Sequence, residues 1–199
     1  MLRKKIIILL FLVLYISTAF YIRHSFNERE YNRNYHISIN ETSIEEELKV
    51  WLNREEGIDY NPDVFDIQRL GNSSTYMALY KLGNNKYGNA QLVIGRNNKL
   101  RIKQSSSGGL LLDTYHDIKT NKGRYYLVMG KNPDLIFDHI EVKVDYKEPY
   151  SYMVDVSKDE FYYTYKKIPE DLVPRTKFIY YDKNNKDRKS TRLNSSHLL

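Results

Sequence analysis

Residues 75–104 read TYMALYKLGNNKYGNAQLVIGRNNKLRIKQ, and this stretch shows how most of the chain is organised. Two segments rich in branched and aromatic residues, Thr75–Leu82 and Asn89–Gly95, are joined by the polar turn GNNK. The turn RNN then leads to Lys99–Gln104, in which apolar and basic residues alternate. Segments of this kind, bounded by Gly and Asn turns, are typical of antiparallel strands joined by hairpins. The stretch therefore predicts three strands of one sheet.

The same pattern extends through the rest of the chain. Further strand-like segments are Val64–Leu70, Leu110–Thr114, His116–Thr120, Arg124–Met129, Ile140–Val144, Tyr150–Val156, Phe161–Tyr165 and Thr176–Tyr181. The second and third of these can be two short strands or one bent strand, and Ser105–Gly109 is expected to be a flexible loop. Closely spaced strands without regular helices between them favour an antiparallel β-sandwich or barrel-like domain over a doubly wound parallel sheet.

One amphipathic helix is expected before the strands, over Ser43–Glu55. Ser43 and Glu46 have the spacing of a capping box, with Thr42 and Glu45 as an alternative register. Ile44, Leu48, Trp51 and Leu52 fall on one apolar face at helical spacing. We expect this face, with Trp51, to pack on the sheet.

The N-terminus contains a candidate membrane anchor. After Arg3-Lys4-Lys5, the segment Ile6–Ile22 carries no charge. A helix of that length spans about 25 Å, close to the lower limit for crossing a bilayer. The basic cluster before it predicts a cytoplasmic N-terminus and an extracytoplasmic domain. The alternative is a signal peptide cleaved after Ala19, which exports the same domain.

The C-terminal residues have an unusual identity. Residues 187–197 read DRKSTRLNSSH, which is similar to one reading frame of a common sequencing adapter over its whole length. We therefore expect residues 187–199 to be an artefact of the record and the domain to be truncated at its C-terminus. The predicted organisation is a basic cluster (1–5), the anchor (6–22), a juxtamembrane stalk (23–42), the helix and β-domain (43–186) and the tail (187–199).

Charge and composition narrow the function classes. The formal net charge is +6, but the basic cluster contributes +3 and the tail +2, which leaves +1 for residues 23–186. This balance gives no support for nucleic-acid binding, and no nucleic-acid partner is expected. The sequence contains no cysteine, which excludes a lipid-modified cysteine, a disulfide framework and thiol catalysis.

No segment carries a strong catalytic, metal or cofactor motif. The best metal candidate is Asp113, His116 and Asp117, but on one strand the two carboxylates share a face and the imidazole points to the other. Asp138 and His139 are neighbours whose side chains are expected to diverge. No metal or cofactor is expected, and the catalytic residues of any enzyme stay unknown.

Tyrosine is abundant, at 19 of 199 residues. This can reflect the preference of tyrosine for strands or an aromatic surface for a glycan or a protein partner. The sharpest candidate surface is Phe161, Tyr162, Tyr163 and Tyr165, because at least one face of a strand here is aromatic.

The basic anchor, the missing cysteines and the β-rich exported part resemble the uncharacterised small membrane-anchored proteins of low-GC Gram-positive bacteria. This resemblance rests on layout and composition and implies no activity. The leading hypothesis is a non-enzymatic, membrane-tethered domain that contacts an envelope protein or glycan. The alternatives are an envelope hydrolase that uses dispersed carboxylates and a ligand-sensing β-domain.

Overall fold

The computed structural model describes residues 2–54, 59–83, 86–108, 113–144, 150–170 and 175–194, excluding the side chains of residues 2–13, 108, 113–116, 175 and 189–194. Two helices, α1 (Leu2–Asn34) and α2 (Glu41–Leu52), precede the strands. The strands are β1 (Asp63–Arg69), β2 (Thr75–Leu82), β3 (Lys86–Ile94), β4 (Leu100–Gly108), β5 (Asp113–Thr120), β6 (Gly123–Lys131), β7 (His139–Val144), β8 (Tyr150–Asp155), β9 (Phe161–Ile168), β10 (Arg175–Tyr181) and β11 (Asp187–Asn194). A 3₁₀ turn at Pro133–Leu135 separates β6 from β7.

The described strands form three antiparallel sheets. The first is a meander in the order β1-β2-β3-β4, the second has the order β5-β6-β9, and the third has the order β11-β10-β7-β8. The chain leaves the second sheet after β6, forms β7 and β8 in the third, and returns to the second as β9. The mainly β, antiparallel class predicted from the sequence is confirmed, and of the two predicted alternatives, sandwich or barrel-like, the described strands do not form a closed barrel.

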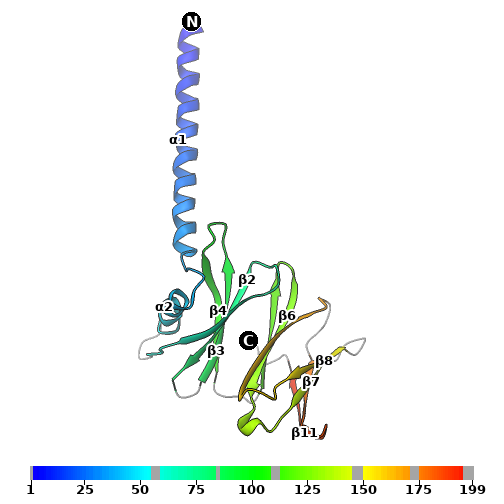
Figure 1. Ribbon diagram of the computed structural model, residues 1–199. Coiled ribbons are helices and arrows are strands. Elements are labelled where there is room, and N and C mark those ends of the chain that lie inside the picture. Colours follow the sequence, from blue (N-terminus) through cyan, green and yellow to red (C-terminus); the bar gives the residue numbers. More distant parts are fainter. Residues whose placement is uncertain are drawn as a thin grey trace.

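Three apolar cores separate four layers (Figure 1). Ile44 and Leu48 of α2 pack with Tyr80 and Leu92 on one face of the first sheet. The opposite face of that sheet, including Met77 and Leu79, packs on Leu127 and Met129 of the second sheet. Val128 and Tyr162, on the other face of the second sheet, pack against the third sheet.

The middle strand β6 is buried on both faces as a result. Tyr125, Leu127 and Met129 point to the first sheet, whereas Tyr126 and Val128 point to the third. This explains why Tyr126 and Leu127, neighbours on the strand, are both fully buried. A strand covered on both sides reads as a continuous apolar run, as β6 does in its segment YYLVM.

The helix α2 begins earlier than the sequence indicated. Asn40 is the N-cap, and its side-chain oxygen accepts a 2.9 Å hydrogen bond from the backbone N–H of Ser43. The predicted start at Ser43 is therefore wrong, because asparagine is as good a cap as serine and lies three residues upstream. The predicted apolar face is confirmed for Ile44 and Leu48, which are fully buried. Trp51, expected to pack on the sheet, is half-buried and lines a hollow instead.

One strand boundary also differs from the sequence expectation, and one alternative left open by the sequence is decided. Residues Ser105–Ser107, expected to form a loop, belong to β4 and pair with β3. The hydroxyl groups of Ser105 and Tyr80 lie 2.7 Å apart, so a polar residue is held within the sheet by a specific partner. The region around His116 is one strand, β5.

The helix α1 extends away from the sheets (Figure 1). It continues through most of the segment expected to be a stalk. Leu14, Ile16, Phe20 and Ile22 are between 50% and 73% exposed. Among the described residues, no helix is both long and apolar enough to cross a membrane. The anchor at Ile6–Ile22 stays a prediction, and its residues 6–13 have side chains outside the description.

The base of α1 is fixed to the turn between β3 and β4. Arg96 forms an ion pair with Glu28, and its guanidinium lies over the ring of Tyr31, 4.3 Å from the centroid. Gly95 leaves room for Tyr31 and Tyr35, because a β-carbon at that position would collide with both rings. The base of α1 and the first sheet are thus packed together.

The residues that resemble an adapter form β11. This strand pairs with β10 in antiparallel register, with Tyr180 opposite Lys189. Backbone hydrogen bonds of a strand pair do not require particular side chains, so an edge strand accepts many polar sequences. The origin of residues 187–199 stays a prediction from the sequence.

Candidate functional site

A bulge in β1 brings two consecutive side chains toward β9. The register of β1 and β2 shifts between Val64 and Asp66, so Phe65 is an extra residue. Val64 packs in the core beneath α2. Phe65 contacts rings of β9, and the charge of Asp66 acts on Tyr163 and Tyr165 of the same strand. Without the bulge, neighbouring residues of a strand point to opposite faces.

Five rings meet around this bulge, and we call them, together with Asp66, the aromatic site. Tyr87 of β3 and Phe161 of β9 are stacked, with centroids 4.0 Å apart. Phe65 lies edge-on to both, at 6.1 Å from Tyr87 and 5.7 Å from Phe161. Tyr163 is 6.1 Å from Phe65 and 6.3 Å from Tyr165. The site therefore draws its rings from three strands in two sheets.

The aromatic site is partly open to solvent. Phe65 and Tyr163 are each 38% exposed, whereas Tyr87, Phe161 and Tyr165 are half-buried. The ammonium of Lys131 lies 5.4 Å from the centroid of the Tyr87 ring. Exposed rings next to one another are costly in water unless a ligand or partner covers them.

Two polar atoms of the aromatic site are buried without a hydrogen-bond partner among the described residues. They are Oδ2 of Asp66 and the hydroxyl oxygen of Tyr165. Burial raises the pKa of Asp66, and a backbone hydrogen bond from Ile67 offsets part of this effect. Burial, followed by the nearby charge of Asp66, also raises the pKa of Tyr165. An orphaned buried polar atom calls for an explanation, and a ligand that supplies hydrogen bonds is one explanation for this pair.

The structure places the residues predicted from the sequence on two faces. Phe161, Tyr163 and Tyr165 lie in the aromatic site, and Tyr162 is 4% exposed in the core against the third sheet. The alternation expected for this strand is therefore present. Phe65, Asp66 and Tyr87 were missed, because a bulge and a contact between strands from different sheets leave no local signal in the sequence.

The other sequence candidates have structural roles where their side chains are described. Asp117 binds Arg124, with Oδ1 2.6 Å from Nε. The side chains of Asp113 and His116 lie outside the described residues. No group of three metal-ligating side chains occurs within the described part of the chain. His24 is exposed on α1, and His36 pairs with Glu47 of α2.

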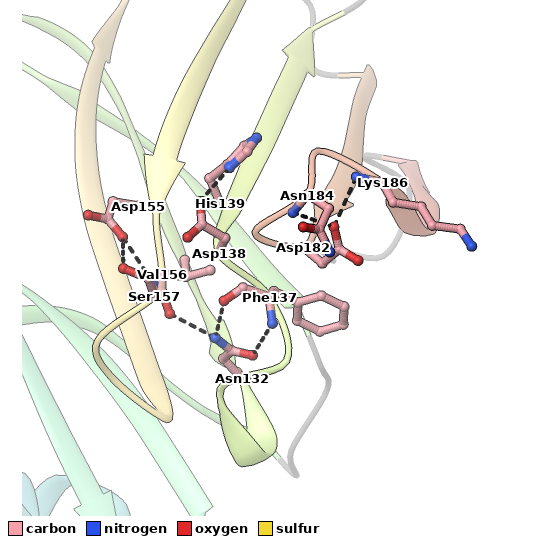
Figure 2. Close-up of polar contacts among 10 residues, drawn as sticks. All are labelled: Asn132, Phe137, Asp138, His139, Asp155, Val156, Ser157, Asp182, Asn184 and Lys186. Carbon is pink, nitrogen blue, oxygen red and sulfur yellow. Dashed lines mark hydrogen bonds and ion pairs between the residues drawn. The ribbon is translucent and has the colours of Figure 1, made fainter.

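Asp138 and His139 contact one another, contrary to the sequence expectation (Figure 2). Nδ1 of His139 is 2.9 Å from Oδ2 of Asp138. The expectation of diverging side chains is wrong because β7 begins at His139, so Asp138 lies just outside the strand. The ring of His139 stacks on Tyr181 of β10, at 5.0 Å between centroids.

The carboxylates near Asp138 are held by their own turns (Figure 2). Asp155 accepts hydrogen bonds from the backbone and hydroxyl of Ser157, which lower the pKa of the Asp155 carboxyl. The backbone N–H of Lys186 is the largest cause that lowers the pKa of Asp182. Hydrogen bonds that stabilise the ionised form are typical of turn carboxylates.

Comparison with protein-family models, with curated proteins and with solved structures gives no match to this chain.

Proposed function

We propose that this protein is an extracytoplasmic domain that α1 tethers to a membrane and that binds an envelope glycan at the aromatic site. One observation carries the proposal. The bulge in β1 brings a partner-free carboxylate oxygen of Asp66 next to two rings, Phe65 and Tyr163, that are each 38% exposed. This combination supplies the two kinds of contact that a sugar makes, namely packing against aromatic rings and hydrogen bonds.

The chemistry of a sugar ring matches the site. One face of a pyranose carries C–H groups that pack against aromatic rings, and its hydroxyls donate hydrogen bonds. Both orphaned atoms are buried, so a sugar reaches them only after neighbouring side chains move; Oδ2 of Asp66 can then accept such a bond, and the hydroxyl of Tyr165 can donate one back. Each bond formed removes the cost of an unsatisfied buried group, which is about 1–3 kcal/mol.

A glycan fits better than an apolar protein surface. The orphaned atoms of the aromatic site, Oδ2 of Asp66 and the hydroxyl oxygen of Tyr165, need polar partners. An apolar partner would bury Asp66 further without satisfying it, which is unfavourable. A hydroxyl-rich ligand covers the rings and satisfies the carboxyl at once.

The tether is supported by the exposed apolar side chains of α1. Leu14, Ile16, Phe20 and Ile22 have no cover in the structure and lie on a helix that extends away from the sheets (Figure 1). Several exposed apolar side chains on one helix favour insertion into lipid. Cleavage after Ala19 would release the domain with its aromatic site unchanged.

The test is co-sedimentation of the full chain with insoluble cell-wall sacculi. The chain is kept in a polyoxyethylene detergent, because a sugar detergent would compete. We expect binding, competition by soluble wall oligosaccharides, and a loss of about tenfold in affinity for Phe65→Ala and for Tyr163→Ala. Phe26→Ala is the matched control, since Phe26 is an aromatic residue 65% exposed on α1. Equal binding of all three variants and the parent would overturn the proposal.

A hydrolase is the second candidate, and the raised pKa of Asp66 is the observation that favours it. A carboxyl that stays protonated to higher pH can act as a general acid on a glycosidic bond. The same incubation decides between the two functions. If the parent protein releases reducing ends from the glycan and Asp66→Asn does not, the protein is a hydrolase and not only a binding domain. If the glycan stays intact after prolonged incubation, binding alone is favoured.

A further inference from the structure

A second hollow lies at the base of α1, away from the aromatic site, and we call it the stem pocket. It has a volume of about 420 Å³ and is formed by the end of α1 with the following linker, by α2 and by β4. The residues that matter for the argument are Arg33, His36, Glu47, Trp51, Arg101 and Lys103. Ligand pockets for small organic molecules begin at about 300 Å³, so the hollow is large enough for one.

The charge in the stem pocket is strongly positive. Glu47 is engaged by His36. Within the described part of the chain, none of Arg33, Arg101 and Lys103 forms an ion pair. The guanidinium of Arg101 lies over the ring of Tyr35, 5.0 Å from its centroid. Three cations thus face one hollow whose single carboxylate, Glu47, is hydrogen-bonded to His36. Cations gathered in this way attract a multiply charged anion.

The three walls are held in place by the fold. Ile37 of the linker exchanges backbone hydrogen bonds with Leu100 at the start of β4, at 3.1 and 2.8 Å. Lys99 donates a 2.9 Å hydrogen bond to Ser38. On the other side, Ile44 and Leu48 fix α2 to the sheet. The segments that carry the cations are therefore held in fixed positions, which reduces the entropy lost on binding.

We propose that the stem pocket binds an organic phosphate ester. Arg33, Arg101 and Lys103 contact the phosphate oxygens, for which guanidinium groups are especially suited because two N–H groups can bind two oxygens. The organic part of the ligand lies against Trp51. A phosphate ester accounts for both the cations and the aromatic wall.

The length of α1 favours a ligand outside the bilayer over a lipid headgroup. If the apolar segment ends at Ile22, Arg33 is eleven residues further along the helix, or about 16 Å. Headgroups extend only about 5–8 Å beyond the hydrocarbon core. This step rests on the proposed tether, whereas the phosphate chemistry of the pocket does not.

Trp51 provides a direct readout, because the sequence contains one tryptophan and it lines the stem pocket. The full chain in polyoxyethylene detergent is titrated with glycerol phosphate, with glycerol as the neutral control, while Trp51 fluorescence is followed. We expect a saturable change with glycerol phosphate that weakens as salt is added, and none with glycerol. A parallel titration with phosphatidylglycerol in the same micelles tests the lipid source.

Variants separate a built site from general attraction of anions. Arg101→Gln combined with Lys103→Gln should weaken binding about tenfold or more, because two phosphate contacts are lost. Lys81→Gln removes an exposed lysine from β2 and should leave binding unchanged. These side chains are exposed, so thermal melting should be unaffected. No fluorescence change with glycerol phosphate, or equal weakening by Lys81→Gln, overturns the proposal. A response to phosphatidylglycerol alone overturns the inference that the phosphate ester comes from outside the bilayer.

Discussion

Tyr87 and Phe161 stack face to face, with ring centroids 4.0 Å apart and an interplanar angle of 9°. The two residues come from β3 and β9, which belong to different sheets. Their contact joins the first two sheets at the rim where Phe65 and Tyr163 are exposed. The stack is therefore both part of the packing and the floor of the aromatic site.

The stack should contribute a measurable coupling energy. Tyr87→Ala and Phe161→Ala are each expected to lower the free energy of unfolding by about 1–3 kcal/mol. A double-mutant cycle should give a coupling of about 0.5–1.5 kcal/mol, because stacked rings interact beyond their burial. Denaturant unfolding gives the free energy of unfolding of the parent, the two single variants and the double variant. Purely additive losses would mean that the rings do not stack in solution.

Asn132 should be one of the most sensitive polar positions. Its amide donates to the carbonyls of Phe137 and Val156 at 2.8 and 2.7 Å, and its oxygen accepts from the N–H of Phe137 at 2.9 Å (Figure 2). The side chain is fully buried, so Asn132→Ala leaves these groups unpaired and should cost about 2–4 kcal/mol. Asn184→Ala, in an exposed turn, is the control and should cost less than about 1 kcal/mol. Thermal melting compares the two variants.

Gly95→Ala should loosen the base of α1 and spare the β-sheets. The new methyl group would collide with Tyr31 and Tyr35, which must then move away from the turn. We expect faster amide hydrogen exchange in residues 28–37 and unchanged exchange in β6 and β7. Gly83→Ala is the matched control, since a β-carbon there meets open space. Unchanged exchange at the base of α1 in Gly95→Ala would contradict the contact.

The pairing of His36 with Glu47 predicts a pH dependence. The hydrogen bond to Glu47 is the largest cause that raises the pKa of His36, and the ring also faces the carbonyl of Arg33, so both nitrogens have acceptors. Arg33, Arg101 and Lys103 line the same pocket, and burial of the ring is the cause that lowers the pKa of His36.

A group with a raised pKa stabilises the fold below its ordinary value, near 6.5, and the contribution is lost as the pH rises through the raised value. His36→Gln should therefore cost more stability at acidic pH than at pH above 8. The pair is partly exposed, so the difference should be about 0.2–1 kcal/mol. A cost that is equal at both pH values would exclude protonated His36 as a stabilising group.

The tail makes a prediction about the gene. An independent genomic read is expected to diverge from the present sequence at about Lys186, because residues 187–197 resemble a translated adapter. In the structure, Nε of Arg188 in this segment donates a 2.7 Å hydrogen bond to Oδ2 of Asp182. A native sequence would keep the turn bonds from the backbone to Asp182 and replace the contact with Arg188. A read that continues through DRKSTRLNSSH would refute the adapter hypothesis.

Local pattern was sufficient to predict most elements of the fold. Thr75–Leu82 was predicted with the same bounds as β2, because apolar and aromatic residues stand between clear turns. Ser105–Ser107 was mistaken for a loop, because its place in β4 depends on Gly88 and Tyr80 in other strands. The division into three sheets depends on which strands pair at long range, and no local pattern encodes it.

The candidate site was predicted only in part for the same reason. The aromatic face of Phe161 and Tyr163 follows from alternation within one strand. Its partners Phe65 and Tyr87 come from strands roughly eighty to a hundred residues earlier in the chain, and such contacts are set by tertiary packing. Asp66 carried no signal, since a lone carboxylate in a strand is usually solvated, and only the bulge turns it inward.

Because β6 is buried on both faces, the order in which the sheets can fold during synthesis is restricted. A ribosome produces β6 well before β9 and β10, yet the second face of β6 is covered only when the third sheet has assembled. Until then Tyr126 and Val128 present an apolar wall that invites aggregation of the nascent chain. The domain is therefore poorly suited to folding from its N-terminus as it is made. It should require a chaperone, or delivery as an unfolded chain, until its last strands have emerged.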